Sequence, residues 1–157
     1  MSFAKDQSGA VLPMVTVSLI TLIGFATLAV DLSRLMDLQT QLQKAADAFA
    51  IAGAAELDGG ADAITRADAA IDALMAGQNS SVWGGVVTVS SRTYHATLPA
   101  TDDLAMGGGG AAAGDARYVE VVVTPVTVNT FLPATLLGAV DNTLTTGATA
   151  VAGFTQV

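Results

Sequence analysis

The stretch that decides the fold runs from Ala10 to Val30 and reads AVLPMVTVSLITLIGFATLAV, without one charged residue. A helix of this length rises about 30 Å, the thickness of the hydrocarbon core of a bilayer. A cleaved signal peptide is an alternative, but its apolar part covers only about 7–15 residues. A helix buried in a soluble protein is the remaining alternative. Because the sequence continues as helix beyond Val30, we predict a retained transmembrane segment.

The overall composition limits the functions that are open to the chain. Its 157 residues include 14 acidic residues, 6 basic residues, one His and no Cys, and the formal net charge is -8. A chain this acidic has no electrostatic means of holding a phosphate backbone, which argues against a nucleic acid as partner. The absence of Cys excludes disulfides, thiolate metal sites and cysteine catalysis. With 52% hydrophobic residues, the chain is also unlike a disordered protein.

Beyond Val30 the apolar residues become periodic. They recur at intervals of three and four, which is typical of a helix that packs along one side. We predict one helix over residues 11–57, ended by Asp58-Gly59-Gly60, and a second helix over residues 61–76 that covers part of this stripe. The part left open is expected to contact other subunits. The stripe consists of Leu35, Leu38, Leu42, Ala45, Phe49 and Ala52.

Asp31 and Arg34 stand out because they are the first charges after the apolar run. They are three residues apart, so their side chains can pair on one helix face. Anchoring of the helix at the membrane surface is one interpretation of this pair. Contact with a neighbouring subunit or another partner at the bilayer surface is the other.

After residue 78 the composition changes to Val, Thr and Gly, which favours strands. Pro125 marks an edge or a bulge within one of them. Residues 102–114 are predicted to be a loop, and residues 131–140 a partly helical cover over one face of the sheet. Helices first and strands second predict an α+β fold with a small antiparallel sheet. Residues 82–91 and 92–98 are expected to form one or two strands, and further strands are expected at residues 118–128 and 144–157.

Residues that carry chemistry are sparse. His95 is the only histidine and lies in a strand-like run, so we interpret it as structural. The run Gly107–Gly110 lacks the Gly-Lys-Ser/Thr that follows in a phosphate loop and is interpreted as a linker. The loop carboxylates do not have the spacing of a calcium-binding loop. We therefore predict no catalytic, cofactor or metal site, no small-molecule substrate, and a protein that is not an enzyme.

Several segments resemble the TadE/TadG-like pilus-assembly proteins. The strand segments at residues 117–123 (RYVEVVV) and 148–153 (ATAVAG) are also similar to later strands of this family. Larger TadG-like proteins add a von Willebrand A domain, and nothing here matches its metal motif. The N-terminal segments that carry the resemblance are SGAV at residues 8–11, the apolar run, LAVDLSR at 28–34, LQKAADA at 42–48 and AGA at 52–54.

The resemblance implies a pilin-like subunit, a minor pilin or an assembly protein of a Flp (tight adherence) pilus, with a type IV pilin-like architecture. It implies no cofactor, and it implies self-association or other pilus subunits as partners. A membrane-tethered binding module that forms no filament is the alternative. Type IV prepilins are cut after a Gly and carry Glu five residues later. Gly9 is thus a possible processing site, but Met14 stands where Glu is expected, so the N-terminus is expected either uncut or cut after Gly9.

Four segments result from these predictions: a short leader (residues 1–9), the transmembrane segment (10–30), a helical stalk with the second helix (31–77) and a β-rich domain (78–157). Lys5 before the apolar run and the acidic excess after it favour a cytoplasmic N-terminus. The body is then outside the bacterial inner membrane, or in an extracellular filament if the protein assembles. Subunit contacts are predicted at Asp31, Arg34, Leu35, Leu38, Leu42 and Phe49.

Two arginines in the apolar run test the membrane prediction. Each charge at the centre of a transmembrane helix costs about 2.5–3.5 kcal/mol of insertion free energy. We expect Leu19→Arg combined with Ile23→Arg to abolish insertion, measured as carbonate-resistant association with membranes. Unchanged carbonate resistance in the double variant would contradict a transmembrane helix at residues 10–30.

Overall fold

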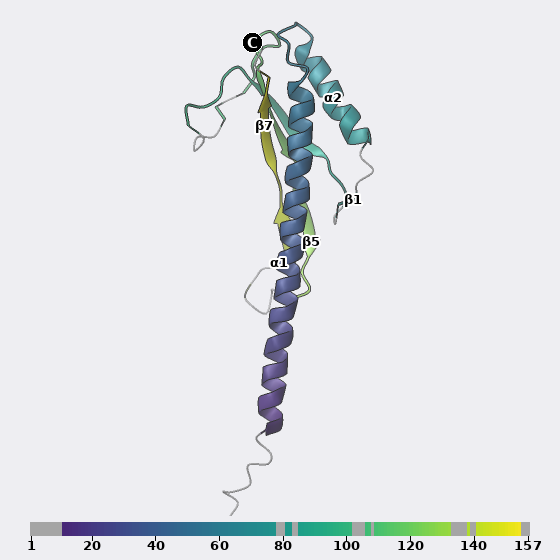
Figure 1. The fold of residues 1–157 in the computed structure, drawn as a ribbon, viewed down its shortest axis with the longest axis vertical. Coiled ribbons are helices and arrows are strands. Elements are labelled where there is room, and N and C mark those ends of the chain that lie inside the picture. The colour runs from purple at the N-terminus through teal and green to yellow at the C-terminus, as the bar shows by residue number, and fades with distance from the viewer. Residues whose placement is uncertain are drawn as a thin grey trace, which may run out of the picture. The chain divides into compact units, whose positions relative to one another are not determined.

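The computed structural model describes residues 11–77, 81–82, 85–101, 106–107, 109–132, 138 and 141–154. Within them, two helices come first and short strands follow, which confirms the predicted α+β order (Figure 1). The chain divides into two compact units. One comprises Met1–Met36 and Asn129–Leu144, and the other comprises Asp37–Val128 and Thr145–Val157.

Helix α1 (Val11–Ala54) contains the apolar run from Val11 onward and the whole periodic stripe. It ends three residues before the predicted end, because the chain tightens there. The N–H of Leu57 bonds to the carbonyl of Ala54 at 3.1 Å, an i to i+3 bond. Gly59 then takes a φ of +81°, which favours glycine, and the N–H of Gly60 donates to the Asp58 carboxylate at 2.8 Å.

Arg66 on helix α2 (Ala63–Gly77) holds this turn together. Its guanidinium pairs with Glu56 at 3.2 Å, with Asp58 at 2.5 Å and with Asp62 one turn earlier. The Gly60 N–H and then Arg66 lower the pKa of Asp58, and the Arg66 hydrogen bond lowers the pKa of Asp62. The predicted helical hairpin is therefore present, with its turn fixed by one arginine.

A three-stranded antiparallel sheet follows, in the order β3 (Val89–His95), β4 (Tyr118–Val123) and β7 (Thr149–Gly153). Two short pairs accompany it: β1 (Ser81–Val82) with β2 (Gly85–Val86), and β5 (Val126–Asn129) with β6 (Thr143–Thr146). The strand predicted at 118–128 is interrupted at Pro125, which has no N–H for a ladder. Gly147 lies against the Pro125 ring and divides the strand predicted from residue 144. Residues 155–157 of that strand lie outside the described residues.

One hydrophobic core joins the two helices and the sheet. Helix α1 contributes Leu38, Leu42 and Phe49, none of which is exposed to solvent. Strand β4 alternates between core and solvent, and its core side chains Val119, Val121 and Val123 are fully buried in the same cluster. The leucine stripe is thus covered within the chain at these positions, because the valine face of the sheet needs an apolar partner.

Gly53 marks the place where α1, α2 and β4 meet. A Cβ on Gly53 would lie 2.8 Å from Cδ1 of Ile71 and 3.4 Å from Cγ1 of Val119. Only a residue without a side chain lets the three elements approach this closely. The Ala52-Gly53-Ala54 segment therefore has a packing role in this fold.

Polar side chains fasten α2 to the edge of the sheet. The Tyr94 hydroxyl donates to Asp68 at 2.8 Å, while Arg92 pairs with Asp68 at 3.3 Å and with Asp72. Burial and then the Asp68 hydrogen bond raise the pKa of Tyr94, and the bond to Asp72 raises the pKa of Arg92. The pairs orient α2 so that Ala63, Ala67 and Ile71 face the core.

Truncating Phe49 tests this joint core. Removing a fully buried aromatic ring costs about 3–5 kcal/mol, so we expect Phe49→Ala to lower the free energy of unfolding by that amount. Urea unfolding of the full chain in mild detergent, followed by circular dichroism, measures the loss. Ile51→Ala is the control, because Ile51 lies two residues further on and is 65% exposed. Truncating an exposed side chain changes the free energy of unfolding by about 0.5 kcal/mol or less. Equal effects of the two variants would contradict the assigned core.

Candidate functional site: the apolar helix and the Asp31 clamp

The first part of α1 has an uncovered apolar surface. Among the described residues, α1 is the one helix long and apolar enough to cross a membrane, and the most apolar part of it is not buried by the rest of the chain. Threonine hydroxyls in this part bond within the helix: those of Thr16 and Thr21 donate to carbonyls one turn earlier at 2.9 Å. Such internal bonding suits a medium without water.

Asp31 directly follows the apolar part of α1, and its side chain is only 5% exposed. One carboxylate oxygen accepts the backbone N–H of Phe131 at 2.9 Å, and the other accepts the N–H of Leu132 at 2.8 Å. A buried carboxylate is tolerated when hydrogen bonds replace its lost hydration. We refer to Asp31, Arg34, Phe131 and Leu132 as the Asp31 clamp.

Arg34 completes the clamp from the same helix face. Its Nη1 lies 4.0 Å from Oδ1 of Asp31, so the pairing expected from the i, i+3 spacing is present. The guanidinium carbon lies 4.8 Å from the centre of the Phe131 ring, within the range of a cation–π contact. Arg34 therefore holds both the carboxylate and the aromatic ring that the carboxylate positions.

Short-range hydrogen bonds shape the segment that carries Phe131. The N–H of Thr130 donates to the carbonyl of Asn142 at 2.9 Å, and its hydroxyl donates to the carbonyl of Leu132 at 2.7 Å. The Asp141 carboxylate accepts the hydroxyl and the N–H of Thr143, and these bonds lower the pKa of Asp141. The two ends of the segment are thereby tied together next to the pair β5–β6.

Phe131 and Leu132 were not predicted from the sequence as partners of Asp31. They lie about a hundred residues away in the chain, and no local pattern links them to a helix. Residues 131–140 were predicted to cover one face of the sheet. Phe131 and Leu132 instead contact Asp31, and most of the remaining segment lies outside the described residues.

The residues predicted to contact other subunits fall into two groups. Leu38, Leu42 and Phe49 lie in the core of the chain itself, whereas Asp31, Arg34 and Leu35 lie at or beside the clamp, buried or half-buried. Contact with another subunit stays a prediction for all six. Gly9 and Ala10 lie outside the described residues, and Val30 is exposed at the end of the apolar run.

A different apolar stripe of α1 remains exposed. Leu28, Leu32 and Met36 follow one another at intervals of four, so they share one helix face. Leu32 is 52% exposed although it is next to the buried Asp31. This stripe continues the apolar surface beyond Val30 on the face that the clamp does not use.

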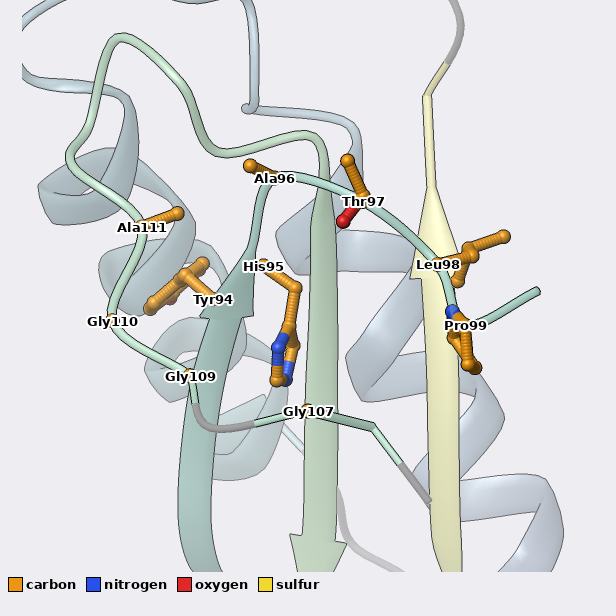
Figure 2. A pocket seen from close by; sticks show the side chains of 10 residues that line it. All are labelled: Tyr94, His95, Ala96, Thr97, Leu98, Pro99, Gly107, Gly109, Gly110 and Ala111. Atoms are coloured by element: carbon orange, nitrogen blue, oxygen red, sulfur yellow. The ribbon is translucent and has the colours of Figure 1, made fainter. Parts of the chain in front are cut away.

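Apart from the clamp, a hollow lies beside strand β3, at the end that carries His95 (Figure 2). Gly109 passes so close to this strand that a Cβ would collide with the Thr93 side chain, and the N–H of Gly110 and of Ala111 bond to the Tyr94 carbonyl at 3.0 and 3.1 Å. His95 is buried, with Nε2 3.4 Å from a Glu120 carboxylate oxygen. Within the described part of the chain, no group of three metal-ligating side chains is present. The hollow therefore does not define a reaction.

The part of the chain that the structure describes thus combines an α+β body with one helix of the membrane-spanning type. Residues 9–56 match the family described as putative Flp pilus-assembly TadE/G-like. The chain thus carries a TadE/G-like N-terminal segment, which confirms the resemblance seen in the sequence, and no von Willebrand domain is indicated. The match includes Asp31, Arg34 and Gly53, whereas the strand segments that resemble the family lie outside it. No curated protein and no solved structure shows significant similarity to the chain.

Replacing Asp31 by Asn tests the clamp. The amide group has one acceptor oxygen and turns an NH₂ donor toward the second N–H, so one of the two hydrogen bonds is lost. We expect faster amide hydrogen exchange at Phe131 and Leu132 in the full chain in detergent. Asp37→Asn is the matched control, because Asp37 is exposed on the same helix and accepts a bond from Gln41. Unchanged exchange in Asp31→Asn would contradict the clamp.

Proposed function

We propose that this protein is a structural component of a Flp-type pilus, either a pilin-like subunit or a minor pilin or assembly protein, and that it assembles through its N-terminal helix. The observation that carries the proposal is the uncovered apolar surface of α1 within the segment that matches the TadE/G-like family. The partners proposed are other copies of the chain or other pilus subunits. The role is structural, without catalysis or a cofactor.

The physical argument starts from the side chains between residues 11 and 30. An apolar surface of this extent is not stable in water and has to be covered by lipid or by protein. Lipid covers it while the helix is in a membrane, and helices of neighbouring subunits would cover it in a filament. Because the run has no charge, exchanging lipid for protein would leave no ion buried without a partner.

The proposed contact surface is the exposed stripe of Leu28, Leu32 and Met36 together with the apolar run that precedes it. This choice differs in part from the leucine stripe in the sequence, because the fully buried members of that stripe stabilise the body of the same chain. Leu35 is half-buried and stays a candidate contact. Asp31 and Arg34 would act through the segment that they hold.

The same proposal includes the topology and the processing of the chain. We place the N-terminus in the cytoplasm and the β-rich body outside the inner membrane, in line with the four segments expected from the sequence. The N-terminus is proposed to stay uncut, with cleavage after Gly9, the possible processing site, as the second possibility. The mass of the intact native protein distinguishes the two.

A membrane-tethered binding module is the second candidate function. The observation that favours it is the full burial of Leu38, Leu42 and Phe49 inside the chain, since α1 beyond Met36 then has little apolar surface left for other subunits. In this case α1 would only anchor the body, and the isolated protein would form no fibre.

Single cysteines distinguish the two functions, because the natural chain contains none. We expect Leu32→Cys, in cells with the native pilus system, to give cross-linked dimers and larger adducts when a short bismaleimide is added to the sheared surface fraction. Thr65→Cys, exposed on α2, is the control and is expected to stay monomeric. A Leu32→Cys protein that is monomeric and confined to the membrane fraction would contradict assembly and support the tethered module.

A further inference from the structure

We propose that Phe131 and Arg34 form a second membrane contact, at the level of the phospholipid headgroups, and that Asp31 is the residue that positions it. The inference requires that the apolar run of α1 enters a membrane. It does not depend on a role in a pilus, and so it goes beyond the proposed function.

The position of the clamp along α1 is the first argument. Asp31 directly follows the uncharged run that begins at Ala10, which is about as long as a bilayer core is thick. If this run spans the core, residue 31 lies where the acyl chains end and the headgroups begin. Because both carboxylate oxygens of Asp31 bind backbone N–H groups of Phe131 and Leu132, this part of the chain is held at the same level.

The exposure of Phe131 is the second argument. Phe131 as a whole is 64% exposed although its backbone N–H is fixed on a buried carboxylate. Aromatic and aliphatic side chains at a membrane surface lie in the boundary between headgroups and acyl chains. The sequence then continues from Leu132 to Val140 without a charged residue, so nothing in its composition opposes contact with lipid.

The charge of Arg34 is the third argument. Arg34 is the first basic residue after the apolar run, and its guanidinium lies over the Phe131 ring. A guanidinium binds phosphate oxygens through paired N–H groups, and long basic side chains at helix ends reach toward the headgroups. The ring and the guanidinium thus present an apolar group and a phosphate-binding group side by side, which is the chemistry of a phospholipid surface.

The surroundings favour lipid over a second copy of the chain as the occupant. The polar residues Thr130, Asp141 and Asn142 are partly or fully exposed, and Thr130, next to Phe131 in the chain, is bonded to Asn142. A tight protein contact over Phe131 would have to remove water from these groups as well as from the exposed part of the Arg34 side chain. A membrane boundary leaves them in water and covers only the apolar ring.

Tryptophan fluorescence in vesicles tests the inference. Trp83, the only tryptophan, is replaced by Phe, and Phe131→Trp is introduced as the reporter. The full chain is reconstituted into vesicles of phosphatidylcholine and phosphatidylglycerol that carry a quencher either near the headgroup or deep in the acyl chains. We expect Phe131→Trp to be quenched several-fold more strongly by the shallow label than by the deep one. In the same background, Leu19→Trp should prefer the deep label, and Ile51→Trp should respond to neither.

The positioning role of Asp31 has its own readout. Adding Asp31→Asn to the reporter chain should abolish most of the shallow quenching, whereas Asp37→Asn should leave it unchanged. Deep quenching of Leu19→Trp should stay the same in both, which shows that the helix is still inserted. Shallow quenching that survives Asp31→Asn would overturn the positioning role.

The remaining outcomes of the fluorescence experiment separate the second membrane contact from insertion of the helix itself. If Leu19→Trp is quenched by the deep label and Phe131→Trp by neither label, the second membrane contact is overturned while the membrane helix stands. If Leu19→Trp is not quenched, the basis of the inference and of membrane anchoring both fail. If Phe131→Trp shifts to the blue without quenching, and only at high protein-to-lipid ratios, a second copy of the chain covers the ring and the inference is again overturned.

Discussion

The N-terminal unit depends on the two hydrogen bonds that the buried carboxylate of Asp31 accepts. Removing a carboxylate from water costs several kcal/mol unless hydrogen bonds replace the lost hydration. Here the replacement comes from two backbone N–H groups of a segment a hundred residues further along the chain. The fold of that unit therefore requires the chain to come back to α1 after the first strands. The pair β5–β6 and the hydrogen bonds of Thr130 and Asp141 hold the returning segment in place.

Much of the fold could be predicted from the sequence because its local patterns are strong. The apolar run and the spacing of leucines indicated α1, the Asp-Gly-Gly turn separated the two helices, and Pro125 interrupted a strand, as the structure shows. Spacing identifies which side of a helix is buried, but it does not identify what covers it. The same holds for the valines of β4, because their alternation identifies which face of the strand is buried but not which element covers it. The two faces are far apart in the sequence, so no local pattern predicts that they contact each other. For that reason the leucine side was predicted to contact other subunits.

The Asp31 clamp shows the same limit for a polar residue. The pairing of Asp31 with Arg34 could be predicted because both residues lie on one helix at a fixed spacing. The bonds to Phe131 and Leu132 use backbone N–H groups, which every residue except proline has, so no side-chain pattern marks them. In the same way, the sequence does not indicate that the aspartate is buried while the leucine next to it is exposed, and only the fold shows this.

The location of the core places a limit on how the chain can assemble. Because the fully buried leucines of α1 stabilise the body, most of the apolar surface that α1 has left for a partner lies in the run before residue 31 and the short stripe up to Met36. Within a membrane, lipid tails solvate this surface as well as a leucine does, so hydrophobic burial alone cannot drive helix association there. Leaving the lipid changes this balance, since each uncovered apolar group would then face water. On the proposed function, extraction from the membrane and association with other subunits must therefore occur together. The clamp keeps the Asp31 carboxylate, at the end of the apolar run, hydrogen-bonded within its own chain throughout that exchange.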